Sequence, residues 1–245
     1  MASAFDDQAA EYDRWYATPL GQLVDRVEKA ALFALLPELK GSLVLEVGCG
    51  SGNITEALAS RGAQVVGLDL SAPMLAAARR RVKPEGFSPP LIRGQARALP
   101  FPGNSFDGVI SVLALDFMPD RPGAVSEMVR VLRPGGFLAL ALLNRYSLWT
   151  LKRLLKAWFK PSLWREIRFA TSQEIRRLLT GQPDLEDISA RQAVFFPPWA
   201  TPFLLRGYPA VESLGHLLQL PTGAFLAAAA RKRGAGQPGE VHNQA

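Results

Sequence analysis

The segment that most constrains this chain is a glycine-rich turn at residues 46–52, with the sequence Glu-Val-Gly-Cys-Gly-Ser-Gly. It follows an apolar run, Leu43–Val47, and precedes a helical pattern that starts at Asn53. Glycine permits positive φ and lets a ligand approach the main chain. A strand, a glycine turn and a helix in this order place backbone amides at the crevice where open α/β sheets bind ligands. An ordinary tight turn is the alternative.

A second polar position supports a nucleotide-binding interpretation. The apolar run Gln64–Leu68 ends at Asp69, whose carboxylate can accept hydrogen bonds from both ribose hydroxyls of a nucleoside. Each such bond is worth about 1.5–3 kcal/mol. A strand-end aspartate that caps the following helix is the alternative. A dinucleotide fingerprint would require its third glycine at position 53, where the chain has Asn53.

Strand and helix patterns alternate through the first part of the chain. This alternation predicts an α/β fold with a doubly wound, Rossmann-like and mostly parallel sheet of seven strands, helices on both faces and an antiparallel terminal strand. The expected strands are Leu43–Val47, Gln64–Leu68, Phe106–Leu113, Phe137–Leu143, Leu185–Phe196 and Thr222–Ala230. The expected helices are Asn53–Ser60, Ala72–Arg81, Pro122–Leu132 and Ser172–Leu179.

The pattern changes after Leu143, where basic and aromatic residues accumulate. We divide the chain into a helical cap (1–36), a cofactor-binding core (37–143), a basic helical insert or lid (144–180), strands that complete the sheet (181–233) and a disordered tail (234–245). In the insert, Leu148–Phe159 reads as a basic amphipathic helix. It either packs on the domain as a lid, contacts a membrane or lipid-like substrate through residues 148–165, or contacts nucleic acid.

Composition and charge limit the partners and the cellular compartment that we expect. The formal net charge is +6, with positive clusters at residues 152–177 and 231–233, and this charge is the only feature that supports nucleic acid, which we do not expect as a partner. One cysteine, Cys49, excludes an intrachain disulfide, and no apolar run reaches the length of a membrane-spanning helix. We expect a cytoplasmic protein, with peripheral membrane contact as the alternative, no metal site and no obligate protein partner.

Four sequence blocks together resemble a known family. Residues 44–52, 66–75, 98–107 and 131–136 are similar, in order and spacing, to class I S-adenosylmethionine-dependent methyltransferases. The ubiquinone and menaquinone biosynthesis type is the subgroup that they resemble most. The resemblance covers about residues 41–142 and implies S-adenosylmethionine as the cofactor.

By this resemblance, the glycine turn borders the methionine part of the cofactor. Glu46 helps to hold the methionine amino group, while Gly48 and Gly50 lie beside it. Asp69 binds the ribose. Cys49 lies within the turn, and we interpret it as a small residue whose main chain faces the cofactor rather than as a nucleophile or redox switch.

The adenine contacts implied by the resemblance come from two later segments. Leu70 and Met74 flank the base, although simple helix packing also explains Met74. The family often has an aspartate where this chain has Gln95. A glutamine carbonyl still accepts a hydrogen bond from the adenine amino group, and the Ala96 amide can donate to a ring nitrogen.

Three further residues are expected around the reacting end. Ser111 and Val112 end a strand beside the expected sulfonium, and Tyr12 belongs to an aromatic amino-terminal segment that covers the cofactor in relatives. Asp116 and His216 are the candidates for a general base, which only a neutral hydroxyl acceptor needs.

The expected function is in-line methyl transfer to a small, apolar or aromatic acceptor. The alternatives are a lipid or membrane-associated acceptor, an RNA methyltransferase and a non-catalytic cofactor-binding protein. Leu115-Asp116-Phe117-Met118 stands where amino-group methyltransferases of bases carry Asn/Asp-Pro-Pro-Tyr/Phe, which argues against base methylation.

Overall fold

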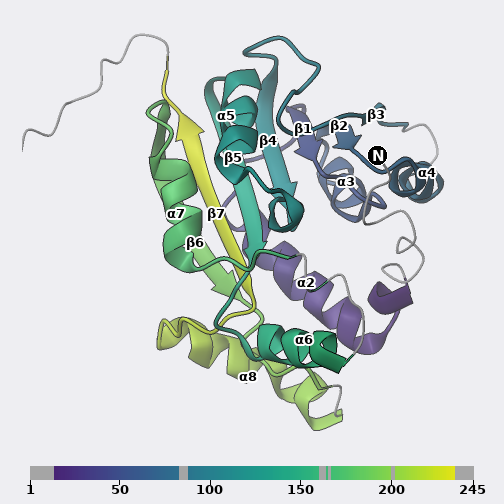
Figure 1. The fold of residues 1–245 in the computed structure, drawn as a ribbon, viewed down its shortest axis with the longest axis vertical. Coiled ribbons are helices and arrows are strands. Elements are labelled where there is room, and N and C mark those ends of the chain that lie inside the picture. The colour runs from purple at the N-terminus through teal and green to yellow at the C-terminus, as the bar shows by residue number, and fades with distance from the viewer. Residues whose placement is uncertain (1–13, 83–87, 160–163, 165–166, 200–201, 235–245) are drawn as a thin grey trace, which may run out of the picture.

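A seven-stranded sheet forms the centre of the computed structural model, which describes residues 14–82, 88–159, 164, 167–199 and 202–234 (Figure 1). Its spatial order is β3-β2-β1-β4-β5-β7-β6. The strands are β1 (Leu43–Val47), β2 (Gln64–Asp69), β3 (Leu91–Arg93), β4 (Phe106–Val112), β5 (Leu132–Leu143), β6 (Leu185–Ala193) and β7 (Phe225–Lys232). Neighbours from β3 to β5 pair in parallel, and β7 pairs antiparallel with both β5 and β6. The expected doubly wound sheet with its antiparallel strand is confirmed.

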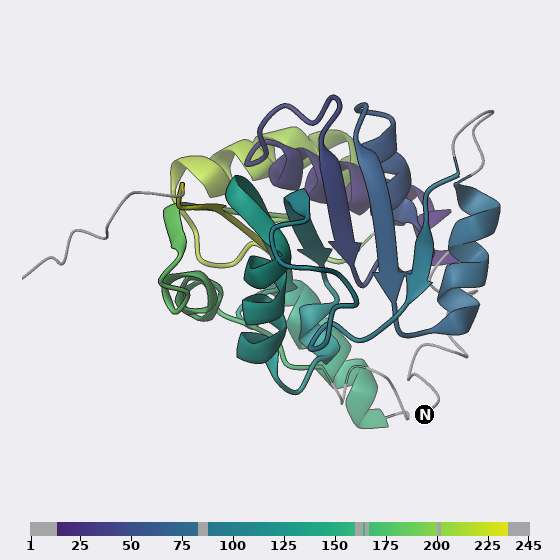
Figure 2. The ribbon, with the colours of Figure 1, turned by 90° about the horizontal axis from the view of Figure 1, so that it is seen from above.

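Helices cover both faces of the sheet (Figure 2). The helices are α2 (Pro19–Phe33), α3 (Asn53–Ala59), α4 (Ala72–Arg81), α5 (Arg121–Val131), α6 (Leu148–Phe159), α7 (Ser172–Thr180) and α8 (Pro202–Leu217). Apolar residues of α5 and α7 share a buried cluster with one set of alternating strand side chains, and those of α2 and α3 share a second cluster with the other set. Successive side chains of a strand point to opposite faces of the sheet, so the strands contribute to one hydrophobic core on each face.

Side-chain caps explain where several helices begin. The Thr18, Ser71 and Asp120 side chains accept hydrogen bonds from backbone amides in the first turns of α2, α4 and α5. Each of these helices also carries proline in its first two positions, where the missing N–H costs nothing. Thr171 and Glu174 form a reciprocal capping box at α7.

Five elements differ from the sequence-based expectation, among them β7, which runs from Phe225 to Lys232 rather than from Thr222 to Ala230. The short strand β3 and the helix α8 were not expected; Pro209 inside α8 obscures its pattern. β5 begins at Leu132 rather than Phe137 because its first residues pair with β4 before an irregularity in the register. β6 ends at Ala193 rather than Phe196, because Val194 adopts a left-handed conformation and the Glu212 carboxylate on α8 accepts the next amides.

The sheet order creates a switch point beside β1. From β1 the chain proceeds to β2 and β3 on one side, and then returns to β4 and β5 on the other. The loops that follow β1 and β4 therefore leave the sheet in opposite directions and open a crevice at the carboxyl ends of the strands. The glycine turn, residues 46–52, lies at this point.

Asn144 joins the end of β5 to the turn before β7. Its side-chain Nδ2 donates to the carbonyls of Pro221 at 2.8 Å and Gly223 at 2.7 Å, and its Oδ1 accepts the Tyr146 amide at 3.0 Å. The residue is 1% exposed. One buried amide side chain therefore holds two carbonyls of a distant segment and one amide of its own turn.

Asn144→Asp should destabilise the fold by about 3 kcal/mol or more, because a carboxylate has no donor for the two carbonyls and its charge is buried. Thermal unfolding should show a fall of roughly 6–12 °C for a chain of this size. The matched change Asn104→Asp, at an exposed position whose Oδ1 accepts from Lys232, should leave the midpoint nearly unchanged. Equal midpoints for both variants would contradict this assignment.

Candidate functional site

The glycine turn has the backbone that its sequence predicts. Gly48, Gly50 and Gly52 have φ values of +79°, +52° and +85°, a region that other residues rarely adopt. A Cβ on Gly48 would lie 2.2 Å from the Ala114 Cβ, whereas a Cβ on Gly50 would meet no atom within 4 Å. Gly48 therefore allows close packing against the segment after β4. Gly50 leaves the main chain open to a ligand.

Asp69 connects the turns that follow β1 and β2. Its Oδ2 accepts the Gly50 amide at 2.8 Å, and its Oδ1 accepts the Ser71 amide at 2.8 Å. The two oxygens thus serve amides of two different turns. Asp69 therefore holds the backbone at the start of α4, as strand-end aspartates commonly do. It also places its carboxylate beside Gly50 in the glycine turn.

Glu46 is a buried carboxyl directly before the turn. It is 2% exposed, and its Oε2 accepts a hydrogen bond from the Thr55 hydroxyl of α3. Burial raises the pKa of Glu46 to about 8, although the Thr55 hydrogen bond opposes the shift. The contact joins β1 to the first turn of α3 and thereby fixes both ends of the glycine turn.

Asn53, at the position that departs from the dinucleotide fingerprint, attaches α2 to the start of α3. Its Nδ2 donates to the Asp25 Oδ1 at 2.6 Å, and its Oδ1 accepts from the Lys29 ammonium at 2.8 Å. Lys29 also pairs with Asp25 at 2.8 Å. A glycine at position 53 could not make these contacts.

The two residues expected to flank adenine differ in exposure. Met74 is 3% exposed on the inner side of α4, and Leu70 is 44% exposed after β2. Gln95 is exposed and forms an isolated bridge with Ala98, while Ala96 is buried. All of these residues follow the ends of β2 and β3, the two strands on the Asp69 side of the switch point.

Residues near the β4 side of the turn are closely packed. Ser111 is fully buried, and its hydroxyl donates to the Val47 carbonyl at 2.9 Å. Val112 is half-buried beside it. Cys49 is buried, and burial raises the pKa of its thiol, so this residue carries little thiolate. That environment favours the packing interpretation of Cys49.

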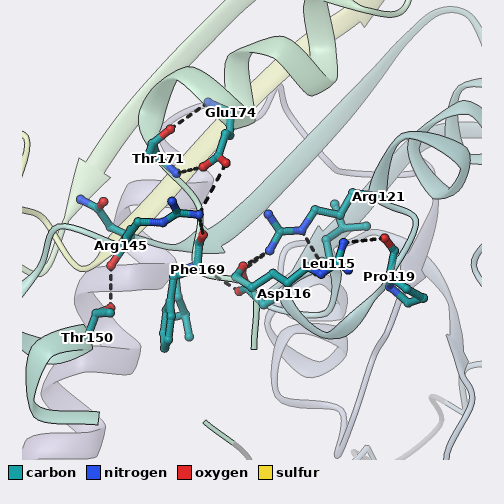
Figure 3. A network of polar contacts seen from close by, with 12 residues as sticks. Leu115, Asp116, Pro119, Arg121, Arg145, Thr150, Phe169, Thr171 and Glu174 are labelled. Carbon is teal, nitrogen blue, oxygen red and sulfur yellow. Dashed lines mark hydrogen bonds and ion pairs between the residues drawn. The ribbon is translucent and has the colours of Figure 1, made fainter. Parts of the chain in front are cut away.

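Asp116 lies in a polar network that links the segments after β4 and β5 (Figure 3). Its Oδ2 accepts the Leu143 amide at 3.0 Å and its Oδ1 lies 3.3 Å from the Arg121 Nη2. Arg121 also donates to the carbonyls of Leu115 and Arg168. Asp116 is fully buried, and burial raises its pKa to about 8 despite these donors. These contacts are structural, and a catalytic role for Asp116 stays a prediction.

The remaining predicted residues are not brought to the turn. His216 lies on α8 with its ring 5.2 Å from that of Phe195, next to β6, which is separated from β1 by three strands. Tyr12 lies outside the described residues.

In the described part of the chain, no group of three or more His, Cys, Asp or Glu side chains is arranged to hold a metal ion. No helix there has the length and hydropathy needed to cross a membrane.

Glu28 is a buried carboxyl that sequence reasoning did not single out. It lies on the buried stripe of α2 with Val24, Ala31 and Leu32, and it is 8% exposed. Burial raises its pKa to about 8, and the Arg153 guanidinium on α6 opposes the shift. A glutamate within an apolar helical stripe is the sequence signal that could have identified it.

A third apolar cluster lies at the ends of β4 and β5. Leu143, Ile167 and Phe169 are buried there, with Leu113, Phe117 and Trp164 packed against them. Leu113 directly follows β4 and has φ +56°. We call this cluster, which lies at the ends of β4 and β5 on the other side of β1 from β2 and Asp69, the apolar wall.

Glu28→Gln should remove a pH-dependent cost of folding. The folded-state pKa of Glu28 lies near 8, above the ordinary glutamate value of 4.5, so the contribution of Glu28 to stability is largest below pH 4.5 and falls as pH rises to about 8. The variant should therefore melt several degrees above the native protein at pH 8 and close to it at pH 5, by differential scanning calorimetry. An equal shift at both pH values would contradict the buried-carboxyl assignment.

Comparison with known proteins identifies the family. A family model described as a methyltransferase domain matches residues 45–140. The chain is 33% identical over 189 residues to a demethylmenaquinone methyltransferase from Anoxybacillus flavithermus, covering 72% of this chain and 78% of that enzyme. The solved structure of a methyltransferase from Thermotoga maritima, described as a possible histamine N-methyltransferase, has a TM-score of 0.69 at 24% identity, covering 94% and 98% of the two chains; it shows the shared fold.

Other relatives are matched over a smaller part of their length. A malonyl-[acyl-carrier protein] O-methyltransferase from Enterobacter lignolyticus is 35% identical over 157 residues, which is 64% of this chain and 59% of that enzyme. A protein from Mycobacterium bovis is 40% identical over 100 residues, 41% of this chain and 36% of its own length. The match to the demethylmenaquinone enzyme, the methyltransferase domain and the fold agree with the geometry of the glycine turn. The chain therefore belongs to the class I S-adenosylmethionine-dependent methyltransferases, and S-adenosylmethionine is its cofactor.

Proposed function

We propose that this protein transfers a methyl group from S-adenosylmethionine to a small, apolar or aromatic acceptor. The observation that carries the proposal is the open, left-handed glycine turn joined to Asp69 on one side of the switch point, with an apolar wall on the other. Relatives act on chemically different acceptors, malonyl-[acyl-carrier protein] and demethylmenaquinone by their names, so the acceptor class rests on this chain's own residues.

The residues of the crevice fit the parts of the cofactor. Gly50 leaves its main chain open for the methionine part, Asp69 places a carboxylate beside Gly50 for the ribose hydroxyls, and Leu70 and Met74 supply apolar contacts for adenine. Glu46 reaches α3 through Thr55, so we assign it to orienting the turn as well as to the methionine amino group. When bound, S-adenosylmethionine supplies an electrophilic methyl group on a sulfonium.

The protein's part in the reaction is to position the acceptor and exclude water. Alignment of two reactants contributes about 7–11 kcal/mol to the barrier reduction. Phe117 and Trp164 provide apolar surface that favours a planar or aliphatic acceptor. No acid or base is required for an acceptor that is already nucleophilic, which agrees with the burial of Asp116 and the distant place of His216.

A lipid or membrane-associated acceptor is the second candidate. It is favoured by the large apolar side chains that α6 exposes directly after β5. Transfer of radiolabelled methyl from S-adenosylmethionine into metabolite, lipid and RNA fractions separates these acceptors. Label in the metabolite fraction supports the main proposal, label in lipid supports the second candidate, and label in RNA or no transfer contradicts both.

Asp69→Ala should weaken S-adenosylmethionine binding by about tenfold or more, since charge-assisted hydrogen bonds to the ribose are lost. Isothermal titration of the native protein and the variant measures the change, with circular dichroism as the control for folding. An adenosyl ligand that lacks the ribose hydroxyls should bind both proteins with equal, weak affinity. Unchanged affinity of the variant for S-adenosylmethionine would remove Asp69 from the ribose site.

Phe117→Ala should raise the KM for the acceptor by about fivefold or more and leave the cofactor Kd within twofold, because an apolar acceptor loses contact area worth roughly 1–2 kcal/mol. Phe101→Ala is the matched control. Phe101 is also half-buried, but it precedes β4 and its ring packs against Phe106 at 5.0 Å. If both substitutions change KM alike, the apolar wall does not determine acceptor binding.

A further inference from the structure

Helix α6 presents an unusual distribution of side chains. Its large apolar residues are between 47% and 82% exposed: Leu148, Leu151, Leu154, Leu155, Trp158 and Phe159. Its buried residues are Trp149, Thr150 and Ala157. At 3.6 residues per turn the exposed set shares one side of the helix and the buried set shares another. The more apolar side of α6 therefore faces away from the domain.

The inward side is firmly attached. The Trp149 Nε1 donates to the Phe196 carbonyl at 2.8 Å, and the Thr150 hydroxyl donates to the Asn144 carbonyl at 2.6 Å. The Trp149 ring also contacts the rings of Trp15 and Phe196. These contacts set the rotation of α6, so the outward direction of its leucines is a consequence of the packing.

The charges carried by α6 itself have one sign. The helix contains Lys152, Arg153 and Lys156 and no aspartate or glutamate. On α6 itself, Lys152 donates to the Pro198 carbonyl at 2.6 Å, and the Arg153 guanidinium packs over the Trp164 ring at 4.6 Å. Lys156 is exposed, and among the described residues it has no hydrogen bond or ion pair. An apolar strip bordered by cations complements the apolar interior and anionic headgroups of a bilayer.

We propose that the outward face of α6 inserts at the surface of an anionic lipid bilayer, with the helix in the plane of the interface. Trp158 and Phe159, which are 80% and 82% exposed, enter the boundary between headgroups and acyl chains. Lys156 contacts the anionic headgroups. A second copy of this chain is a poorer occupant, because pairing of the two faces would bring like charges together.

Helix α6 lies close to the proposed acceptor site. The helix begins five residues after β5 ends, at the end of the sheet toward which the β4 and β5 arrows point (Figure 1). The apolar cluster of Leu143, Phe117 and Trp164 occupies the same end. A bilayer bound at α6 therefore lies near the apolar wall. Binding of α6 to the bilayer requires neither cofactor nor turnover.

The test is co-sedimentation of the full chain with vesicles, in the absence of S-adenosylmethionine. Binding should be at least about tenfold stronger to phosphatidylcholine vesicles that contain one-third phosphatidylglycerol than to phosphatidylcholine alone. Leu151→Gln combined with Leu155→Gln should reduce binding about tenfold or more. Lys156→Gln should reduce it about fivefold, the equivalent of roughly 1 kcal/mol per cation near the surface.

Arg176→Gln on α7 is the matched charge control, since Arg176 is exposed and lies outside α6; its binding should stay within twofold of the native value. The α6 variants change exposed side chains, so their thermal midpoints and cofactor Kd should match the native protein. Equal binding to both vesicle types, or native binding by the leucine double variant, would overturn the proposal. A lipid-free dimer that the double variant converts to monomer would instead assign the face to a second copy.

Discussion

The carboxylate of Asp69 joins two turns that the chain forms separately. One oxygen holds the Gly50 amide after β1 and the other holds the Ser71 amide before α4, so the loops after β1 and β2 share a single group. The glycine turn is held by this carboxylate through the Gly50 amide, by the Leu68 carbonyl through the Gly48 and Cys49 amides, and by the close packing of Gly48 on Ala114. The geometry of the cofactor crevice depends on this arrangement.

Buried polar side chains hold the segments that follow the ends of β4 and β5. Asn144 attaches the end of β5 to the turn before β7, and Asp116 attaches the same strand end to the segment after β4 through the Leu143 amide. Both side chains satisfy backbone groups that would otherwise be buried without partners. The segments that we propose to contact the acceptor are thus held by hydrogen bonds rather than by regular strand pairing.

The orientation of α6 connects this framework to the surface. Trp149 and Thr150 are held by backbone carbonyls of other segments, which turns the leucines of the helix outward. Amphipathicity is commonly read as burial of the apolar side. In α6 the inward contacts are a tryptophan, a threonine and an alanine, and the apolar strip is left for the surroundings of the protein.

Local sequence patterns predicted much of the fold of this protein. The glycine spacing, the Asp69 position and the alternation of strands and helices predicted the parallel sheet and a ligand crevice at the glycine turn, because these signals depend on backbone conformation and on short-range periodicity. Boundaries such as the start of β5 and the end of β6, and the helix α8, depended on register and on contacts with Glu212, which are distant in sequence. The burial of Glu28 and Asp116 and the direction of the α6 leucines were likewise decided by tertiary packing, since a periodic pattern defines two sides of a helix without saying which one the domain covers.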